Sequence, residues 1–133
     1  MYLLDTDTLV FALHGHPGVL RNIRDHVGDP AAVSVISYGE LLYGAAKSNH
    51  PLENIASVRG LMERFPVVDV TPAVMEVFAS LKAKLEAPGK RIDDFDLLIA
   101  STALSLGSAV VTNNVRHFRS VPHLAVESWA TYQ

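Results

Sequence analysis

The sequence predicts an α/β domain built on a mostly parallel sheet of about five strands, with helices covering both faces. Short apolar runs alternate with longer segments whose apolar residues recur at helical spacing. This alternation favours a parallel sheet, because parallel neighbours need a crossover connection that is usually a helix. The 133 residues, 49% of them hydrophobic, suit one domain with its own core. With no repeat, low-complexity tract or linker in the sequence, we expect residues 1–133 to form a single domain.

Each predicted strand is a short apolar run that ends near polar residues. In chain order the predicted strands span residues 2–4, 33–36, 67–70, 109–112 and 124–126. The predicted helices span residues 8–13, 18–27, 38–47, 52–65, 72–87 and 95–106. Two of these helices have start signals. Thr71 precedes Pro72, a proline at the first helical position, and the spacing of Ser37 and Glu40 matches a capping box.

Composition excludes several classes of protein. The chain has no cysteine, which excludes a disulfide framework, a cysteine zinc site and a thiol nucleophile, and fits a reducing cytoplasm. We expect neither a signal peptide nor a membrane partner, because no apolar run approaches the ~20 residues that a membrane span needs. Eleven Lys and Arg against 14 Asp and Glu give a net charge of −3, so a polyanion would bind through a local patch or a metal ion.

Polar side chains follow the predicted strands at their carboxyl ends, where open parallel sheets bind ligands. They are Asp5, Thr6 and Asp7 after the first strand, Ser37 and Glu40 after the second, Thr112, Asn113 and Asn114 after the fourth, and Asp93, Asp94 and Asp96 at the start of the last long helix. Crowded carboxylates repel one another unless a cation neutralises them, so this pattern predicts Mg²⁺ or Mn²⁺. Each acid also has a simpler reading as a helix cap or first-turn residue, and spacing alone leaves both readings open.

Four segments carry a family resemblance, and they are LDTD at 4–7, SVISYGELLYG at 34–44, DLLIA at 96–100, and VTNN at 111–114 with Phe118. In order and spacing they resemble the PIN domain, and more narrowly the VapC ribonuclease toxins of bacterial type II toxin–antitoxin systems. The resemblance runs from Leu3 to Trp129. It implies an α/β/α sandwich, a Mg²⁺- or Mn²⁺-dependent endoribonuclease acting on structured RNA with tRNA favoured, a VapB-like antitoxin partner and a homodimer.

The resemblance also implies roles for individual residues. Asp5, Glu40 and Asp96 would be metal ligands, and Asn114 stands where many PIN domains have a fourth acid. A metal-activated water would then cleave the phosphodiester bond, leaving a 5′-phosphate and a 3′-hydroxyl.

Hydrogen bonds from neighbouring polar residues would support these acids. The supporting positions are Thr6, Ser37, Thr112 and Asp7. Asp7 departs from the asparagine more common in the family, and Asp93 and Asp94 depart from the small residues common before the third acid. Candidate RNA contacts are Lys47, Lys90, Arg91, Arg116 and Arg119, since each lies in a segment near the predicted cleft.

Other functions fit parts of the same sequence. A metal-independent ribonuclease would use a histidine pair from among His14, His16, His50 and His117. A catalytically weak PIN-like module would only bind RNA or a partner. Leu9 and the short chain disfavour a haloacid dehalogenase phosphatase, and a receiver domain would need an Asp after the central strand and a Lys after the last.

Overall fold

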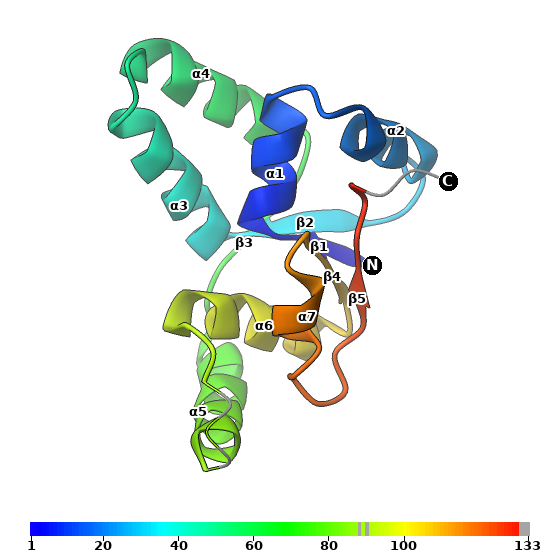
Figure 1. Cartoon of the computed structure of the whole chain (residues 1–133), viewed down its shortest axis with the longest axis vertical. Coiled ribbons are helices and arrows are strands. Elements are labelled where there is room, and N and C mark those ends of the chain that lie inside the picture. Colours follow the sequence, from blue (N-terminus) through cyan, green and yellow to red (C-terminus); the bar gives the residue numbers. More distant parts are fainter. Residues whose placement is uncertain (88, 90, 131–133) are drawn as a thin grey trace.

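Five parallel strands form one sheet through the centre of the molecule, in the order β3-β2-β1-β4-β5 (Figure 1). The strands are β1 (Tyr2–Leu4), β2 (Ala31–Ser34), β3 (Val67–Val68), β4 (Ala109–Val111) and β5 (Val126–Glu127). The structure is a computed structural model that describes residues 1–87, 89 and 91–130.

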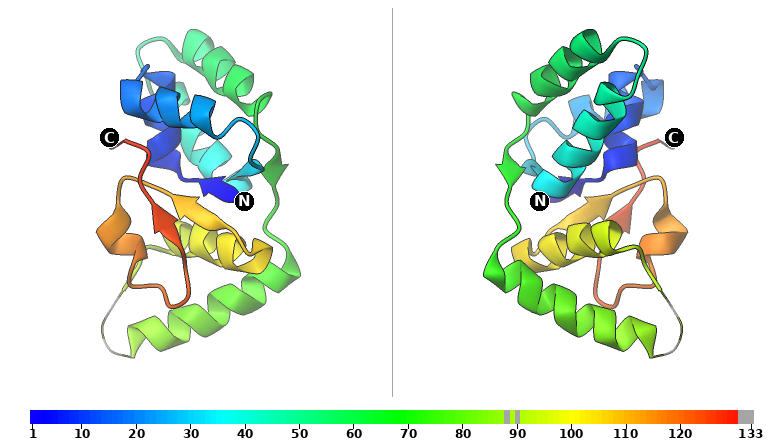
Figure 2. Two further views of the ribbon diagram at one scale, coloured as in Figure 1. Left: turned by 90° about the vertical axis from the view of Figure 1, so that its right-hand side faces the viewer. Right: turned by 90° about the vertical axis from the view of Figure 1, so that its left-hand side faces the viewer.

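Helices cover both faces of this sheet (Figures 1 and 2). On one face lie α1 (Thr6–Leu13), α2 (Pro17–Asp25), α3 (Val35–Ala46) and α4 (Pro51–Met62). On the other lie α5 (Pro72–Glu86), α6 (Asp94–Leu106) and the short α7 (Val115–Phe118). The predicted α/β/α sandwich is therefore confirmed. In the described part of the chain, no helix is long and apolar enough to cross a membrane.

Alternation along the strands divides the core into two layers. Leu3 and Val110 belong to the cluster packed against α5, α6 and α7, whereas Leu4 and Val111 belong to the cluster packed against α1, α3 and α4. Successive side chains of a strand point to opposite faces, and each fully buried aliphatic side chain contributes roughly 1.5–3 kcal/mol. Continuous apolar strands therefore hold both layers of helices.

The start of α3 differs from the prediction. The second strand was predicted at residues 33–36, but β2 spans Ala31–Ser34 and α3 begins at Val35. The Ser34 hydroxyl is the N-cap and accepts a hydrogen bond from the Ile36 N–H at 3.1 Å. The capping box at Ser37 is wrong, since Ser37 lies inside the helix. An apolar run such as Val35-Ile36 fits either a strand or a buried helix turn, and here the serine cap decides between them.

The other predicted elements are present with shifted ends. Helix α1 begins at Thr6 rather than residue 8, because Asp5 caps it, and β3 and β5 are only two residues long. Helix α7 was not predicted, since four residues are too few to show helical periodicity.

The order of the strands places the carboxyl ends of β1 and β4 side by side. From β1 the chain builds outward to β2 and β3, then returns to form β4 and β5 on the other side. In open α/β sheets, ligands bind in the crevice at this reversal of strand order. The residues that follow β1 and β4 are thus in position to form a site.

Candidate active site

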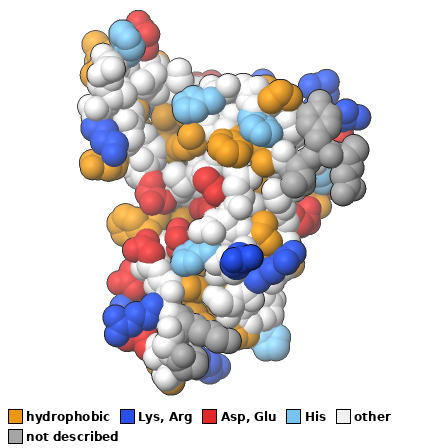
Figure 3. Space-filling model, viewed as in Figure 1, with side chains coloured by type: hydrophobic (Ala, Val, Ile, Leu, Met, Phe, Trp, Pro, Cys, Tyr) orange, Lys and Arg blue, Asp and Glu red, His pale blue; other side chains and the backbone are white. Residues whose placement is uncertain are grey.

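A cleft of about 370 Å³ lies at the carboxyl ends of the strands, and several protein segments line it. Its lining residues are Asp5, Thr6, Asp7, Val10, Phe11, Glu40, Asp96 and Asn114. The three predicted metal ligands come from the N-cap of α1, the interior of α3 and the first turn of α6. Figure 3 shows acidic side chains gathered around a hollow on this face, with histidine and basic side chains beside it. The structure therefore brings Asp5, Glu40, Asp96 and Asn114 together, as predicted.

Asp5 is the most buried of the cleft acids, with 5% of its surface exposed. Its Oδ1 accepts a hydrogen bond from the Thr6 N–H, and its Oδ2 accepts one from the Thr112 hydroxyl, each at 2.8 Å. Burial is the main cause that raises the pKa of Asp5 to about 7, and the negative charges of Asp7 and Asp96 add to it. The two hydrogen bonds oppose this rise without cancelling it. Asp5 is thus the N-cap of α1, and its surroundings disfavour the charged form of its carboxyl group in the metal-free protein.

Asp7 connects α1 to the loop that follows β4. Its carboxylate accepts a hydrogen bond from the Asn113 N–H at 3.1 Å, and the Thr112 hydroxyl lies 3.4 Å from both of its oxygens. The Thr112 Oγ1 also accepts the Asn114 N–H at 3.0 Å. Thr112 therefore links the two aspartates and the loop that carries Asn114, which fits its predicted supporting position.

Glu40 is oriented by two hydroxyl groups. The Thr6 hydroxyl donates to Glu40 Oε1 at 2.7 Å, and the Ser37 hydroxyl lies 3.0 Å from the Thr6 oxygen. Ser37 is buried and stands one turn before Glu40 in α3. A hydroxyl has one hydrogen, so the consistent arrangement has Ser37 donating to Thr6 and Thr6 donating to Glu40. Ser37 thus supports Glu40 indirectly, and it does not cap the helix.

Asp96 has a partner that the sequence did not single out. The His117 Nε2 of α7 lies 3.1 Å from Asp96 Oδ2, with 29% and 27% of the two side chains exposed. Burial raises the pKa of Asp96, and Asp93 and Glu40 add to this rise, whereas His117 opposes it. The sequence predicted His117 only as one of four candidate histidines. None of the four histidines is among the residues that line the cleft, and His16 and His50 stand at the N-caps of α2 and α4. The structure therefore brings no histidine pair to the cleft lining.

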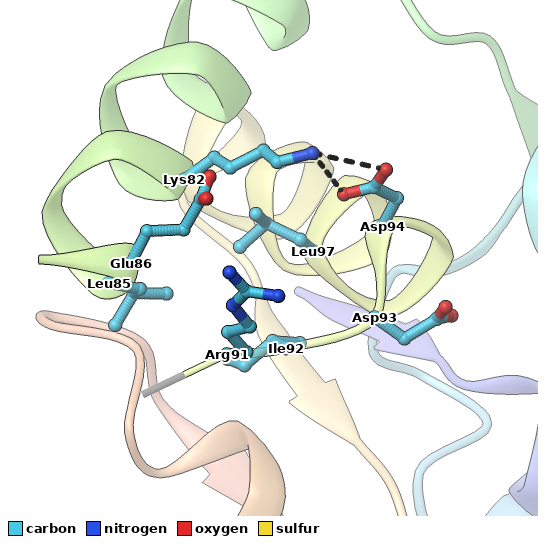
Figure 4. A pocket seen from close by; sticks show the side chains of 8 residues that line it. All are labelled: Lys82, Leu85, Glu86, Arg91, Ile92, Asp93, Asp94 and Leu97. Carbon is cyan, nitrogen blue, oxygen red and sulfur yellow. Dashed lines mark hydrogen bonds and ion pairs between the residues drawn. The ribbon is translucent and has the colours of Figure 1, made fainter. Parts of the chain in front are cut away.

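The predicted RNA contacts lie outside the cleft lining, as far as the structure describes them. The Lys47 ammonium group sits 4.7 Å from the centre of the Tyr43 ring at the end of α3. Arg116 and Arg119 are exposed at α7. Arg91 lines a neighbouring cavity of about 320 Å³ together with the paired Lys82 and Asp94 (Figure 4). Lys90 lies outside the described residues.

The chemistry of the donors fits a hard divalent cation. Asp5, Glu40 and Asp96 supply carboxylate oxygens, the ligands that Mg²⁺ prefers in proteins. Over residues 1–87, 89 and 91–130, no Lys or Arg forms an ion pair with any of these three carboxylates. In the same residues, no three His, Cys, Asp or Glu side chains are already grouped as ligands of one ion. Their oxygens are instead held by Thr6, Thr112 and His117.

Comparison with known proteins identifies the class to which this fold and cleft belong. The family model described as PIN domain matches residues 2–124, which is nearly the whole chain. The chain therefore belongs to the PIN-domain family.

Individual relatives define the group within this family. Ribonuclease VapC2 of Haemophilus influenzae is 36% identical over 129 residues, covering 96% of this chain and 97% of the relative. The tRNA(fMet)-specific endonuclease VapC of Shigella flexneri is 33% identical, covering 97% and 98%. The solved structure of VapBC2 from Rickettsia felis, bound to a promoter DNA fragment, matches with a TM-score of 0.91 at 32% identity, covering 96% of this chain and 98% of that one. These relatives place the chain among the VapC members of the family.

Proposed function

We propose that this protein is a metal-dependent endoribonuclease and the toxin of a type II toxin–antitoxin module. The observation that carries the proposal is the meeting of Asp5, Glu40 and Asp96 in one cleft, without a Lys or Arg partner in the described residues. A cleft of this charge repels an RNA backbone unless a cation lies between them. The similarity to proteins named VapC ribonucleases supports the same activity.

Asp5, Glu40 and Asp96 would hold Mg²⁺ or Mn²⁺. When bound, the cation would polarise the scissile phosphate and lower the pKa of an attacking water. The residues around it orient the carboxylates: Thr6 holds Glu40, and the Thr112 hydroxyl holds Asp5. The site would thus be prepared for an ion by hydrogen bonds that fix which oxygens face the cleft.

Structured RNA is the proposed substrate, with tRNA as the first candidate. Two relatives, from Shigella flexneri and Salmonella typhimurium, are named tRNA(fMet)-specific endonucleases and are 33% and 34% identical to this chain. Arg116 and Arg119 are suited to phosphate contacts, because they are exposed around α7, whose His117 contacts a cleft acid. These two arginines would offset the negative charge of the cleft on the side where RNA enters.

A VapB-like antitoxin is the proposed protein partner. Solved relatives from Rickettsia felis and Salmonella typhimurium are described as VapBC bound to DNA. An arginine from such a partner would suit the unneutralised carboxylates of the cleft, because guanidinium and carboxylate form strong paired hydrogen bonds. We place the complex in the cytoplasm, which the absence of cysteine favours. The homodimer implied by the resemblance stays a prediction, and sedimentation of the purified protein would test it.

Cleavage of labelled tRNA by the purified protein tests the proposal. We expect cleavage with Mg²⁺ or Mn²⁺, and loss of cleavage with EDTA and in Asp96→Asn. Asp29→Asn is the matched control, since Asp29 is exposed in the loop that enters β2, at the opposite end of the strands. Cleavage that survives EDTA would contradict the metal requirement. Absence of cleavage on tRNA and ribosomal RNA alike would favour a module that only binds.

A further inference from the structure

We propose that His117 is a nitrogen ligand of the cation in this cleft, and that it makes the site prefer Mn²⁺ over Mg²⁺. The inference depends on the proposed function only in requiring that the cleft acids bind a cation. It assigns His117 a role in binding the ion, whereas the carboxylates alone would form an all-oxygen site.

The spacing of His117 and Asp96 is that of two neighbouring ligands. Their Nε2 and Oδ2 atoms are 3.1 Å apart. Around an octahedral ion with bonds of about 2.1 Å, adjacent ligand atoms lie about 3.0 Å apart. In the metal-free protein this is also the distance of a hydrogen bond from His117 to Asp96. An ion that replaces the Nε2 proton can bind both atoms with little change in the distance between them, and its binding releases that proton to solvent.

The fold holds the imidazole in this place. Helix α7 follows directly from the loop after β4, and the Asn114 carbonyl accepts hydrogen bonds from the N–H groups of His117 and Phe118 at 3.1 and 3.3 Å. Phe118 is fully buried in the core cluster that includes Leu3 and Val110. Because Phe118 anchors the short helix, its neighbour His117 is held against α6 and partly open to solvent, where an ion can reach it.

The ligand type sets the preference between metals. Mg²⁺ prefers oxygen ligands and near-ideal octahedral geometry, whereas affinity for nitrogen donors rises along the transition series from Mn²⁺ onward. An imidazole beside Asp96 should thus strengthen Mn²⁺ binding and leave Mg²⁺ binding nearly unchanged. A lysine or arginine at the same place would neutralise Asp96 but could not bind a metal ion.

Pulsed electron paramagnetic resonance of Mn²⁺ bound to the RNA-free protein tests this directly. We expect modulation from an imidazole ¹⁴N nucleus in the unmodified protein and none in His117→Gln, in which the amide still reaches Asp96 by hydrogen bonding. His50→Gln is the control, because His50 is an exposed N-cap of α4 that makes no side-chain capping bond. Calorimetric titration should show the Kd for Mn²⁺ rising about 10-fold or more in His117→Gln, with the Kd for Mg²⁺ changing less than about 2-fold because Mg²⁺ prefers oxygen ligands.

Three results would overturn the inference. The first is bound Mn²⁺ without nitrogen modulation in the unmodified protein, a reading that does not depend on whether His117→Gln folds. The second is an equal loss of affinity for both metals, which would make His117 a residue that only positions Asp96. The third is no Mn²⁺ binding at all, which would also refute the metal site proposed above. A protein that shows the nitrogen signal but cleaves no RNA would keep this inference and refute the ribonuclease.

Discussion

Ionisation of the buried Asp5 carboxyl group should lower the unfolding free energy of the metal-free protein as pH rises, and the loss should be complete above neutral pH. Asp5 is 5% exposed, and burial together with Asp7 and Asp96 raises its pKa from 3.8 to about 7. Replacing it with asparagine removes the charge and keeps an oxygen that can accept the Thr6 N–H. We therefore expect Asp5→Asn to abolish cleavage while making the protein more stable in alkaline buffer.

The magnitude follows from the difference between the folded and unfolded pKa values. A raised pKa means that the folded protein binds the proton more tightly, so stability falls as pH rises from about 4 to about 7 and is then constant. One pKa unit corresponds to about 1.36 kcal/mol, which gives a cost of about 4 kcal/mol at pH 8. More than half of this cost develops between pH 5 and pH 8.

Urea unfolding at pH 5 and pH 8, with EDTA present, measures this cost. Between the two pH values, the unfolding free energies of the unmodified protein and of Asp29→Asn should fall by about 2–3 kcal/mol more than that of Asp5→Asn. Added Mn²⁺ should stabilise the unmodified protein more than Asp5→Asn, because a bound ligand stabilises the state that binds it. If Asp5→Asn loses as much stability with pH as the unmodified protein does, the Asp5 charge is not the source of the cost.

Three further substitutions test the contacts around the cleft. Thr6→Val removes the hydroxyl that donates to Glu40 at 2.7 Å, and it should lower kcat/KM for RNA cleavage by roughly 10–100-fold with unchanged circular dichroism. Unchanged kinetics would show that Thr6 does not orient Glu40 for cleavage. Ser34→Ala removes the cap of α3 and should cost about 1 kcal/mol in urea unfolding, and no cost would mean that other contacts fix the helix start. Phe118→Ala leaves a cavity in the core and should cost about 3–5 kcal/mol; a loss below about 1 kcal/mol would show that Phe118 does not anchor α7.

The sequence predicted the layers of the fold because its strands are buried on both faces. Apolar runs such as residues 2–4 and 109–111 are unbroken, as expected for strands covered by helices on both sides. The boundary between β2 and α3 was wrong because Val35 and Ile36 are β-branched residues that favour strands, whereas the Ser34 hydroxyl starts the helix. A local hydrogen bond here outweighs the residue preference.

The acids of the cleft and their supporting hydroxyl groups were predicted by their place after strands and by the family motifs, but which partner contacts which acid was not. Contact between Thr6 and Glu40 depends on how α1 packs on α3, which no spacing along the chain reveals. The approach of His117 to Asp96 depends on the four-residue helix α7, which is too short to leave a pattern in the sequence. The place of His117 shortly after VTNN was the only sequence hint of this contact, and His117 was one of four histidines considered as candidates for acid–base catalysis.

The chemical nature of the RNA ends tests the central claim most directly. If the carboxylates of Asp5, Glu40 and Asp96 hold an ion that activates water, the products should carry no cyclic phosphate. The resemblance to PIN-domain nucleases implies that the two ends are a 5′-phosphate and a 3′-hydroxyl. Sequencing of the cleaved tRNA ends, with selective ligation of each end type, distinguishes these products from others. Products that end in a 2′,3′-cyclic phosphate would show attack by the RNA's own 2′-hydroxyl and would contradict the account.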